Sequence, residues 1–159
     1  MTDILWAPWR ERYVRMYKKY KGCLFCKAPA RHKDPANLIV KRSRHAFAML
    51  NKYPYNSGHL LVSPYRHQKD LRPLSAEERL DLVELLCEMQ ELLIRTLRPQ
   101  SFNVGINIGG LAGAGFRDHL HFHIVPRWKA DCNFMSIVGN ARVIPGSLNG
   151  LYKKLKRAL

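Results

Sequence analysis

Three histidines in the second half of the chain alternate with apolar residues, in the run HLHFHIV over residues 119–125. Alternation with a period of two is typical of a β-strand, so His119, His121 and His123 are predicted to project from one exposed face. The apolar residues between them then fill the core. Three imidazoles in a row fit two chemistries. They can bind zinc or iron, or one can act as a nucleophile whose neighbours set its tautomer and charge.

A glycine-rich segment, NIGGLAGAG over residues 107–115, comes shortly before these histidines. Glycine lets the backbone approach a ligand closely and turn its N–H groups toward an anion. The segment is neither a Walker loop nor a dinucleotide fingerprint, because it leads into a strand where those lead into a helix. Beside the histidines it predicts a bound phosphate, and attack by histidine on phosphorus is the expected reaction.

The charge of the chain also suits an anionic ligand. Among 159 residues, 27 Lys and Arg face 12 Asp and Glu, a formal net charge of +15. Such a charge favours a nucleotide, nucleic acid or anionic lipid, or is simply a well-solvated surface. No apolar run approaches the ~20 residues of a membrane helix. The first residues also lack the features of a signal peptide, so we expect a cytoplasmic protein without membrane contact.

The strands that position the histidines are predicted from hydrophobic spacing. Residues 38–40, 46–50 and 59–62 are short apolar runs separated by turns, which predicts an antiparallel meander. Residues 102–108 alternate apolar with polar or small side chains and predict a strand with one buried face. Residues 22–37, which contain two prolines, are expected to be a loop.

One long helix is predicted over residues 75–98. Ser75 and Glu78 have the spacing of a capping box, leucines recur at helical spacing behind them, and Pro99 follows. A shorter helix is expected around the basic residues 153–157. The length and a 47% hydrophobic content suit one domain. We therefore expect an α+β fold with a mostly antiparallel sheet, one long core helix and a shorter C-terminal helix.

Residues 1–21 combine tryptophans and tyrosines with basic side chains. Trp9, Tyr13, Met16 and Tyr20 fall at helical spacing. We interpret this segment as an arm that packs on the domain or on a partner subunit, in preference to a binder of single-stranded nucleic acid.

The histidine run resembles the signature of the histidine triad (HIT) family of nucleotide hydrolases and transferases, in which three histidines alternate with apolar residues. Upstream, NKYP at 51–54 and GHLLVSP at 58–64 are similar to the family's nucleoside-binding strand and turn. Four further segments resemble its branch of bacterial diadenosine tetraphosphate phosphorylases and related adenylyltransferases: 6–10, 113–115, 133–135 and 142–145. The resemblance implies one HIT domain over 1–159, with an arm (1–21), a core (22–128) and an extension (129–159).

The resemblance also implies roles for individual residues. His121 is the implied nucleophile, which forms a covalent histidine–AMP intermediate with an adenosine polyphosphate and passes AMP to phosphate or water. His123 then contacts phosphate oxygens, and His119 orients the row. The implied substrate-binding residues are Asn51, Asn107, Gly113, Ala114 and Gly115, with His59 as a support behind them. The implied partners are the polyphosphate, phosphate and a second copy of the chain in a homodimer.

Alternative functions are open at this point. We favour a phosphorylase over a hydrolase that uses water, because residues 113–118 lack the glutamine or serine that many hydrolases of the family carry there. The second alternative is a zinc-dependent hydrolase that uses all three histidines as ligands. The third is a nucleic-acid-binding protein, which the charge permits.

Cys23 and Cys26 form a CxxC pair. In a cytosolic chain this pair indicates a metal site or redox use more than a structural disulfide. A likeness to galactose-1-phosphate uridylyltransferases implies zinc bound by Cys23, Cys26, His67 and His119. Two thiolates and two imidazoles suit tetrahedral zinc. The alternative is a reduced pair of loop cysteines, and no organic cofactor is expected.

Overall fold

The computed structural model describes residues 22–113, 115–129, 131 and 146–159. The predicted arm with its helix, Ala114 and the segment 132–145 lie outside the described residues. The described elements, in chain order, are α2 (Leu24–Ala30), α3 (Asp34–Asn37), β1 (Ile39–Arg42), β2 (Ala46–Leu50), β3 (Leu60–Pro64), α4 (Ala76–Leu97), β4 (Ser101–Ile106), β5 (Phe122–Arg127) and α6 (Leu148–Arg157).

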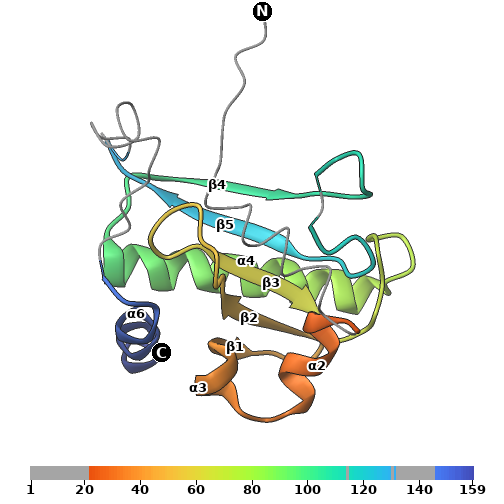
Figure 1. The fold of residues 1–159 in the computed structure, drawn as a ribbon. Coiled ribbons are helices and arrows are strands. Elements are labelled where there is room, and N and C mark those ends of the chain that lie inside the picture. The colour runs from red at the N-terminus through yellow and green to blue at the C-terminus, as the bar shows by residue number, and fades with distance from the viewer. Residues whose placement is uncertain (1–21, 114, 130, 132–145) are drawn as a thin grey trace, which may run out of the picture.

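Five strands form one sheet in the order β1-β2-β3-β5-β4, and every neighbouring pair is antiparallel. The predicted meander is therefore confirmed as β1-β2-β3. The chain then crosses one face of the sheet as α4 and returns as the β4–β5 hairpin (Figure 1). In this topology β5 lies between β3 and β4, with His123 opposite Leu61 on one side and Gly105 on the other. The α+β class is confirmed.

The long helix is confirmed together with its cap. Ser75 accepts a hydrogen bond from the backbone N–H of Glu78, and the Glu78 carboxylate accepts one from Ser75 N. The buried face of the helix packs on β2 and β3, and α6 closes the same core with Tyr152 and Leu155. None of the described helices is both long and apolar enough to cross a membrane.

Two leucines of α4 allow a matched test of this packing. Leu82 is fully buried, whereas Leu80 is 61% exposed. We expect Leu82→Ala to lower the free energy of unfolding by about 2–5 kcal/mol, because it removes apolar contacts and leaves a cavity. The same substitution at Leu80 should change it by about 0.5 kcal/mol or less. Urea unfolding of the two variants measures the difference, and equal losses would contradict the assigned helix face.

Residues 22–37 form two short helices, so the expected loop is wrong. Phe25 and Ala28 of α2 are buried against the sheet, and this burial outweighs the proline inside the helix. Arg42 holds the pair of helices in place through Asp34 and the carbonyl of Pro29. The Arg42 guanidinium lowers the pKa of Asp34, so this ion pair is present at neutral pH.

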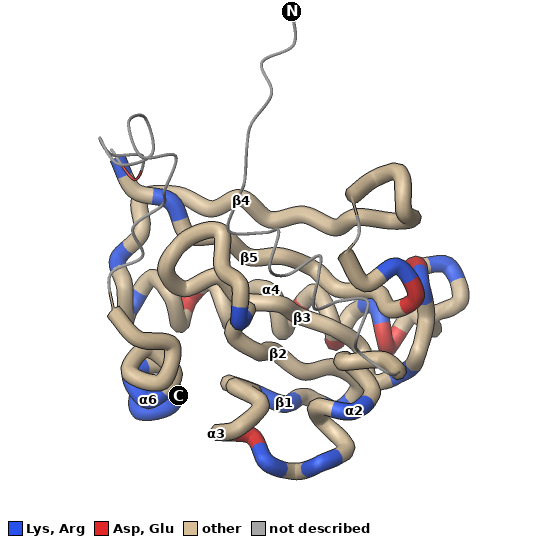
Figure 2. Tube along the Cα trace, in the orientation of Figure 1, with Lys and Arg blue, Asp and Glu red and all other residues tan. Residues whose placement is uncertain are grey.

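Both strands of the β4–β5 hairpin differ from the prediction, β4 in its burial and β5 in where it begins. β4 is an edge strand whose apolar face is only partly covered, with Val104 45% exposed. The buried face expected for 102–108 is therefore wrong. β5 begins at Phe122 rather than His119, because Leu120 N donates instead to the carbonyl of Gln68 in a loop. Among the described residues, Figure 2 shows lysines and arginines spread over several separate parts of the chain.

Candidate active site

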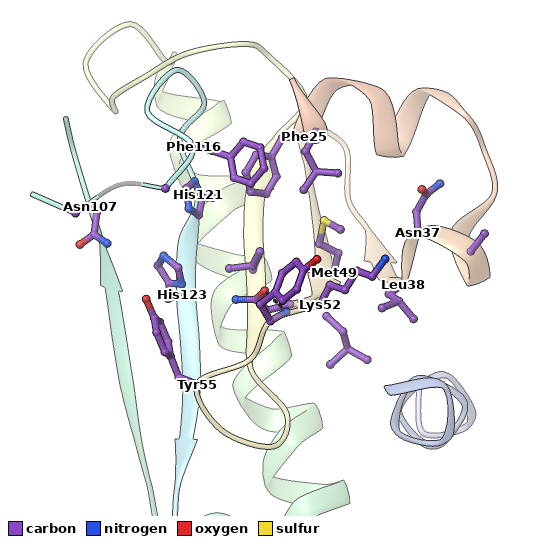
Figure 3. A pocket seen from close by; sticks show the side chains of 18 residues that line it. Phe25, Asn37, Leu38, Met49, Lys52, Tyr55, Asn107, Phe116, His121 and His123 are labelled. Carbon is purple, nitrogen blue, oxygen red and sulfur yellow. Dashed lines mark hydrogen bonds between the residues drawn. The ribbon is translucent and has the colours of Figure 1, made fainter. Parts of the chain in front are cut away.

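A cavity of about 230 Å³ lies between α2 and α3, the end of β2 and the segment that joins β4 to β5. Six of the predicted substrate-binding and catalytic residues line it: Asn51, Asn107, Gly113, Gly115, His121 and His123. His121 and His123 lie side by side at one end of the cavity, whereas Asn37, Leu38 and Lys52 lie at the other (Figure 3). The two histidines therefore lie at one end of the cavity, and a second polar group, Asn37 and Lys52, lies at the opposite end.

The tautomer of His121 follows from its hydrogen bond. Its Nδ1 lies 2.9 Å from the carbonyl oxygen of His119, which only accepts, so Nδ1 carries the proton and donates. The other nitrogen, Nε2, then holds an unprotonated lone pair. The side chain is 6% exposed, and burial lowers its pKa, which keeps the ring neutral at pH 7. A neutral imidazole with a free Nε2 is the form required of a nucleophile.

A second chain of hydrogen bonds sets the tautomer of His123. The buried His59 accepts at Nδ1 from the backbone N–H of Tyr55, at 3.0 Å, and lies 3.3 Å from the Asn51 amide. Its Nε2 therefore carries the proton and donates to His123 Nδ1 at 2.9 Å. His123 Nε2 must then carry a proton. The cavity thus has a lone pair on His121 next to a donor on His123.

Breaking this chain at His59 should impair turnover. In His59→Phe the ring volume is kept, but the donation from His59 Nε2 to His123 Nδ1 is lost, so the tautomer of His123 that points a lone pair at a substrate anion becomes accessible. We expect kcat to fall roughly 10²-fold, the low end for loss of a positioned proton-bearing group. His45→Phe is the matched control, because His45 Nε2 is buried without a hydrogen-bond partner among the described residues. Steady-state kinetics measure kcat for the two variants. Equal kcat values would contradict the proposed hydrogen-bond chain from His59 to His123.

His119 does not share the cavity with the other two histidines. Its Nε2–H donates to the carbonyl of Pro64 at 2.9 Å, and its Nδ1 points away toward Cys23 and Cys26. The expected row on one exposed face is therefore wrong, since His119 and His121 are almost fully buried beneath α2. The separation of His119 from the cavity also disfavours a site in which all three histidines bind one ion.

The four predicted metal ligands form one group, here called the metal cluster: Cys23, Cys26, His67 and His119. Their ligand atoms all lie within 4.8 Å of one another. His119 Nδ1 is 3.2 Å from both Cys23 Sγ and His67 Nδ1, and Cys26 Sγ is 3.3 Å from His67 Nδ1. Ligand atoms around tetrahedral zinc are separated by about 3.3–3.8 Å, given the usual Zn–N and Zn–S bond lengths. The arrangement therefore fits a four-coordinate metal.

The electrostatics of the metal cluster point the same way. Burial and the neighbouring Cys23 raise the pKa of the Cys26 thiol to about 11. Burial lowers the pKa of His119 to about 4, so its Nδ1 lone pair is available. Two close thiolates are unfavourable without a cation, and a divalent metal removes that penalty.

Several residues that line the cavity were not predicted from the sequence. Phe25, Phe116, Tyr53 and Tyr55 supply aromatic surface, and Tyr55 stacks on His59 with ring centroids 5.0 Å apart. Lys52 adds an exposed cation at the far end. The only sequence signal was the position of Phe25 between the two cysteines and of Tyr53 and Tyr55 beside Asn51.

Comparison with known proteins identifies relatives of the chain. The HIT domain family matches residues 32–130. The AP-4-A phosphorylase of Mycobacterium tuberculosis is 37% identical over an alignment of 148 residues that covers 89% of this chain and 76% of that protein. The asymmetrical bis(5'-nucleosyl)-tetraphosphatase of Schizosaccharomyces pombe is 32% identical over 72% of this chain and 63% of its own length.

Solved structures share the fold. A hypothetical histidine triad nucleotide-binding protein from Sulfolobus tokodaii superimposes with a TM-score of 0.70 at 24% identity, over 86% of this chain and 91% of that one. A zinc-bound histidine triad family protein from Mycobacterium smegmatis has a TM-score of 0.62 at 19% identity, over 92% of this chain and 91% of its own. Both likenesses show the fold alone.

Proposed function

Because this chain belongs to the HIT domain family, we propose that it is a nucleotidyl-transferring enzyme that cleaves diadenosine tetraphosphate with phosphate as the acceptor. The observation that carries the proposal is the pairing of an unprotonated Nε2 on His121 with a proton on His123 at one end of the cavity. The relative named AP-4-A phosphorylase supports this substrate and this acceptor.

In the first step His121 Nε2 attacks the α-phosphorus and forms a nitrogen–phosphorus bond. The bond from that phosphorus to the bridging oxygen breaks, and the electron pair leaves with ATP. The ring then carries a positive charge that its Nδ1–H shares with the His119 carbonyl, so this hydrogen bond strengthens as the intermediate forms. In the second step phosphate attacks the same phosphorus, the nitrogen–phosphorus bond breaks, and ADP is released.

The rest of the cavity binds charge and nucleoside. His123 Nε2–H donates to a phosphate oxygen, and Asn107 with the Gly113 and Gly115 backbone holds the neighbouring phosphates. Asn51 binds the ribose, since its Oδ1 is already placed by the backbone N–H of Tyr53 at 2.9 Å. The aromatic wall takes the base. His59 acts through His123 and touches no substrate.

We further propose that the metal cluster binds a structural Zn²⁺. Cys23, Cys26, His67 and His119 would hold it, and the ion would cross-link α2 to the segment before β5. The ion would neutralise the two thiolates there and would touch none of the reacting atoms. The zinc-bound family member from Mycobacterium smegmatis is in keeping with this assignment.

We propose that residues 1–159 form one cytoplasmic HIT domain that pairs as a homodimer. Among the described strands β4 pairs only with β5, so its outer edge is open, and Val104 and Ile108 expose about half of their surface beside it. Two copies joined along β4 bury both edges. Sedimentation equilibrium should give twice the chain mass of 18.5 kDa, and a monomer at micromolar concentration would contradict the pairing.

One incubation tests the proposed reaction. The protein is mixed with diadenosine tetraphosphate, with and without inorganic phosphate, and the products are separated by ion exchange. ADP and ATP in equal amounts, formed only with phosphate, support the phosphorylase. AMP and ATP formed without phosphate identify a hydrolase, the activity that the tetraphosphatase relative favours. A salt titration with oligonucleotides addresses nucleic-acid binding, and a steep loss of affinity with salt would support that alternative.

A further inference from the structure

Phe25 lies between the two cysteines of the metal cluster and also contacts the proposed nucleophile. Its side chain is fully buried, and its ring is stacked on His121 with centroids 4.7 Å apart and planes at 23°. The same ring lies 5.4 Å from His119 and meets the edge of Phe116 at 5.5 Å. One phenyl ring therefore links a metal ligand, the nucleophile and the wall of the cavity.

Three contacts hold the imidazole of His121. The ring of His123 meets it edge-on, with centroids 5.0 Å apart, and the other two contacts come from Phe25 and His119, which connect it to the metal cluster. The ring of Phe25 covers one face and fixes the plane of the imidazole. The carbonyl of His119 accepts a hydrogen bond from Nδ1–H and selects which of the two ring orientations about the Cβ–Cγ bond is adopted. Phe25 directly precedes Cys26, and His119 belongs to the metal cluster, so a metal bound there would place both contacts at once.

Alignment of the attacking atom has a large effect on transfer rates. A misplacement of about 1 Å can lower a rate 10²-fold, because the reacting atoms must be close and in line. Without the stack on Phe25, the imidazole keeps its Nδ1 hydrogen bond and its edge contact with His123, but the ring can tilt about the Cβ–Cγ bond and carry Nε2 away from phosphorus. The stacked ring of Phe25 prevents this movement.

We propose that Phe25 is a positioning residue through which the metal cluster aims His121 Nε2 at the α-phosphorus. The inference rests on the proposed function and adds that the occupancy of the metal cluster sets the rate of transfer to His121. Phe25 touches no reacting atom in this role. It therefore affects kcat far more than the affinity for nucleotide.

Phe47 offers a matched control. It is fully buried in the same core cluster and is also stacked at 23°, but on Tyr65, and it does not line the cavity. We expect Phe25→Leu to lower kcat about 10- to 100-fold, with KM changed about threefold or less. Phe47→Leu should keep kcat within about twofold. Equal kcat losses in the two variants, or a rise in KM that accounts for the whole effect of Phe25→Leu, would overturn the proposal.

The link to the metal needs a second comparison. Both variants are loaded with Co²⁺, whose visible absorption reports a tetrahedral site, so that an intact metal cluster is demonstrated without turnover. Chelated wild-type protein, kept folded as judged by circular dichroism, should lose kcat to about the extent that Phe25→Leu does. Chelating Phe25→Leu should then add little, since coupled effects are not additive. Independent, multiplying losses would show that the metal does not act through Phe25.

A substrate-free measurement separates this inference from the proposed function. In ¹⁵N spectra of the imidazoles, wild-type protein should show one sharp Nδ1–H signal for His121, assigned by its absence in His121→Asn. Phe25→Leu should broaden or lose it, and Phe47→Leu should keep it. An unchanged signal in Phe25→Leu overturns the positioning role. Failure of wild-type protein to cleave diadenosine tetraphosphate overturns the proposed function while leaving this comparison intact.

Discussion

Replacing His121 by asparagine should abolish turnover while nucleotide still binds. The amide Nδ2 of asparagine can take over the donation to the His119 carbonyl, so the local structure is kept, but no Nε2 lone pair reaches the cavity. We expect kcat to fall by roughly 10⁴-fold or more, a barrier increase of about 5 kcal/mol. The binding of ADP, measured by calorimetry, should stay within about threefold of wild type, because uniform binding is separate from the covalent step.

His32 supplies the control for this experiment. It is exposed and has a φ of 49°, a backbone conformation that asparagine tolerates well. His32→Asn should therefore leave both kcat and the free energy of unfolding unchanged. A His121→Asn variant with more than a few per cent of wild-type turnover would refute the covalent mechanism. A second combination of results would also refute it. In that case no adenylylated wild-type protein is isolated after acid-free quenching, and His121→Asn loses activity only because it unfolds.

Removal of the metal should have the largest effect on stability. With zinc present at about 1,000 times its dissociation constant, binding adds about 4 kcal/mol to the folded state. For a domain of this size that corresponds to a fall in Tm of roughly 8–16 °C on chelation. Cys26→Ala should bind no zinc at one equivalent and should melt like the chelated protein. Because ligation displaces protons from the thiols, the gain from zinc should shrink as the pH falls.

Cys87 provides the matched control for Cys26. It is an exposed cysteine of α4, far along the chain from the metal cluster. Cys87→Ala should bind zinc stoichiometrically and keep its Tm within about 2 °C, as expected for a surface substitution. Metal analysis measures the zinc content of each variant, and scanning calorimetry measures its Tm. If chelation leaves the Tm of wild-type protein unchanged, the metal cluster is only a group of reduced side chains.

Local patterns in the sequence were sufficient for much of the fold. The capping box, the leucine spacing of α4 and the short apolar runs of the meander are properties of neighbouring residues, so they are visible in the chain alone. Residues 22–37 were predicted wrongly because α2 depends on burying Phe25 against distant segments, and α3 depends on the ion pair of Asp34 with Arg42. The partial exposure of the apolar face of β4 likewise depends on its place at the sheet edge, which periodicity does not specify.

The identities of the candidate site residues also came from the sequence. The histidine run, the glycine segment and the CxxC pair determined which side chains have the right chemistry. Their division between two centres was decided by the tertiary structure, because loop 65–75 and α2 bring His67 and the cysteines to His119 and leave His121 and His123 for the cavity. The tautomers of His121 and His123 depend on a carbonyl and on His59, whose distances only folding sets. The contact of Phe25 with His121 joins residues 96 positions apart, so no local pattern contains it.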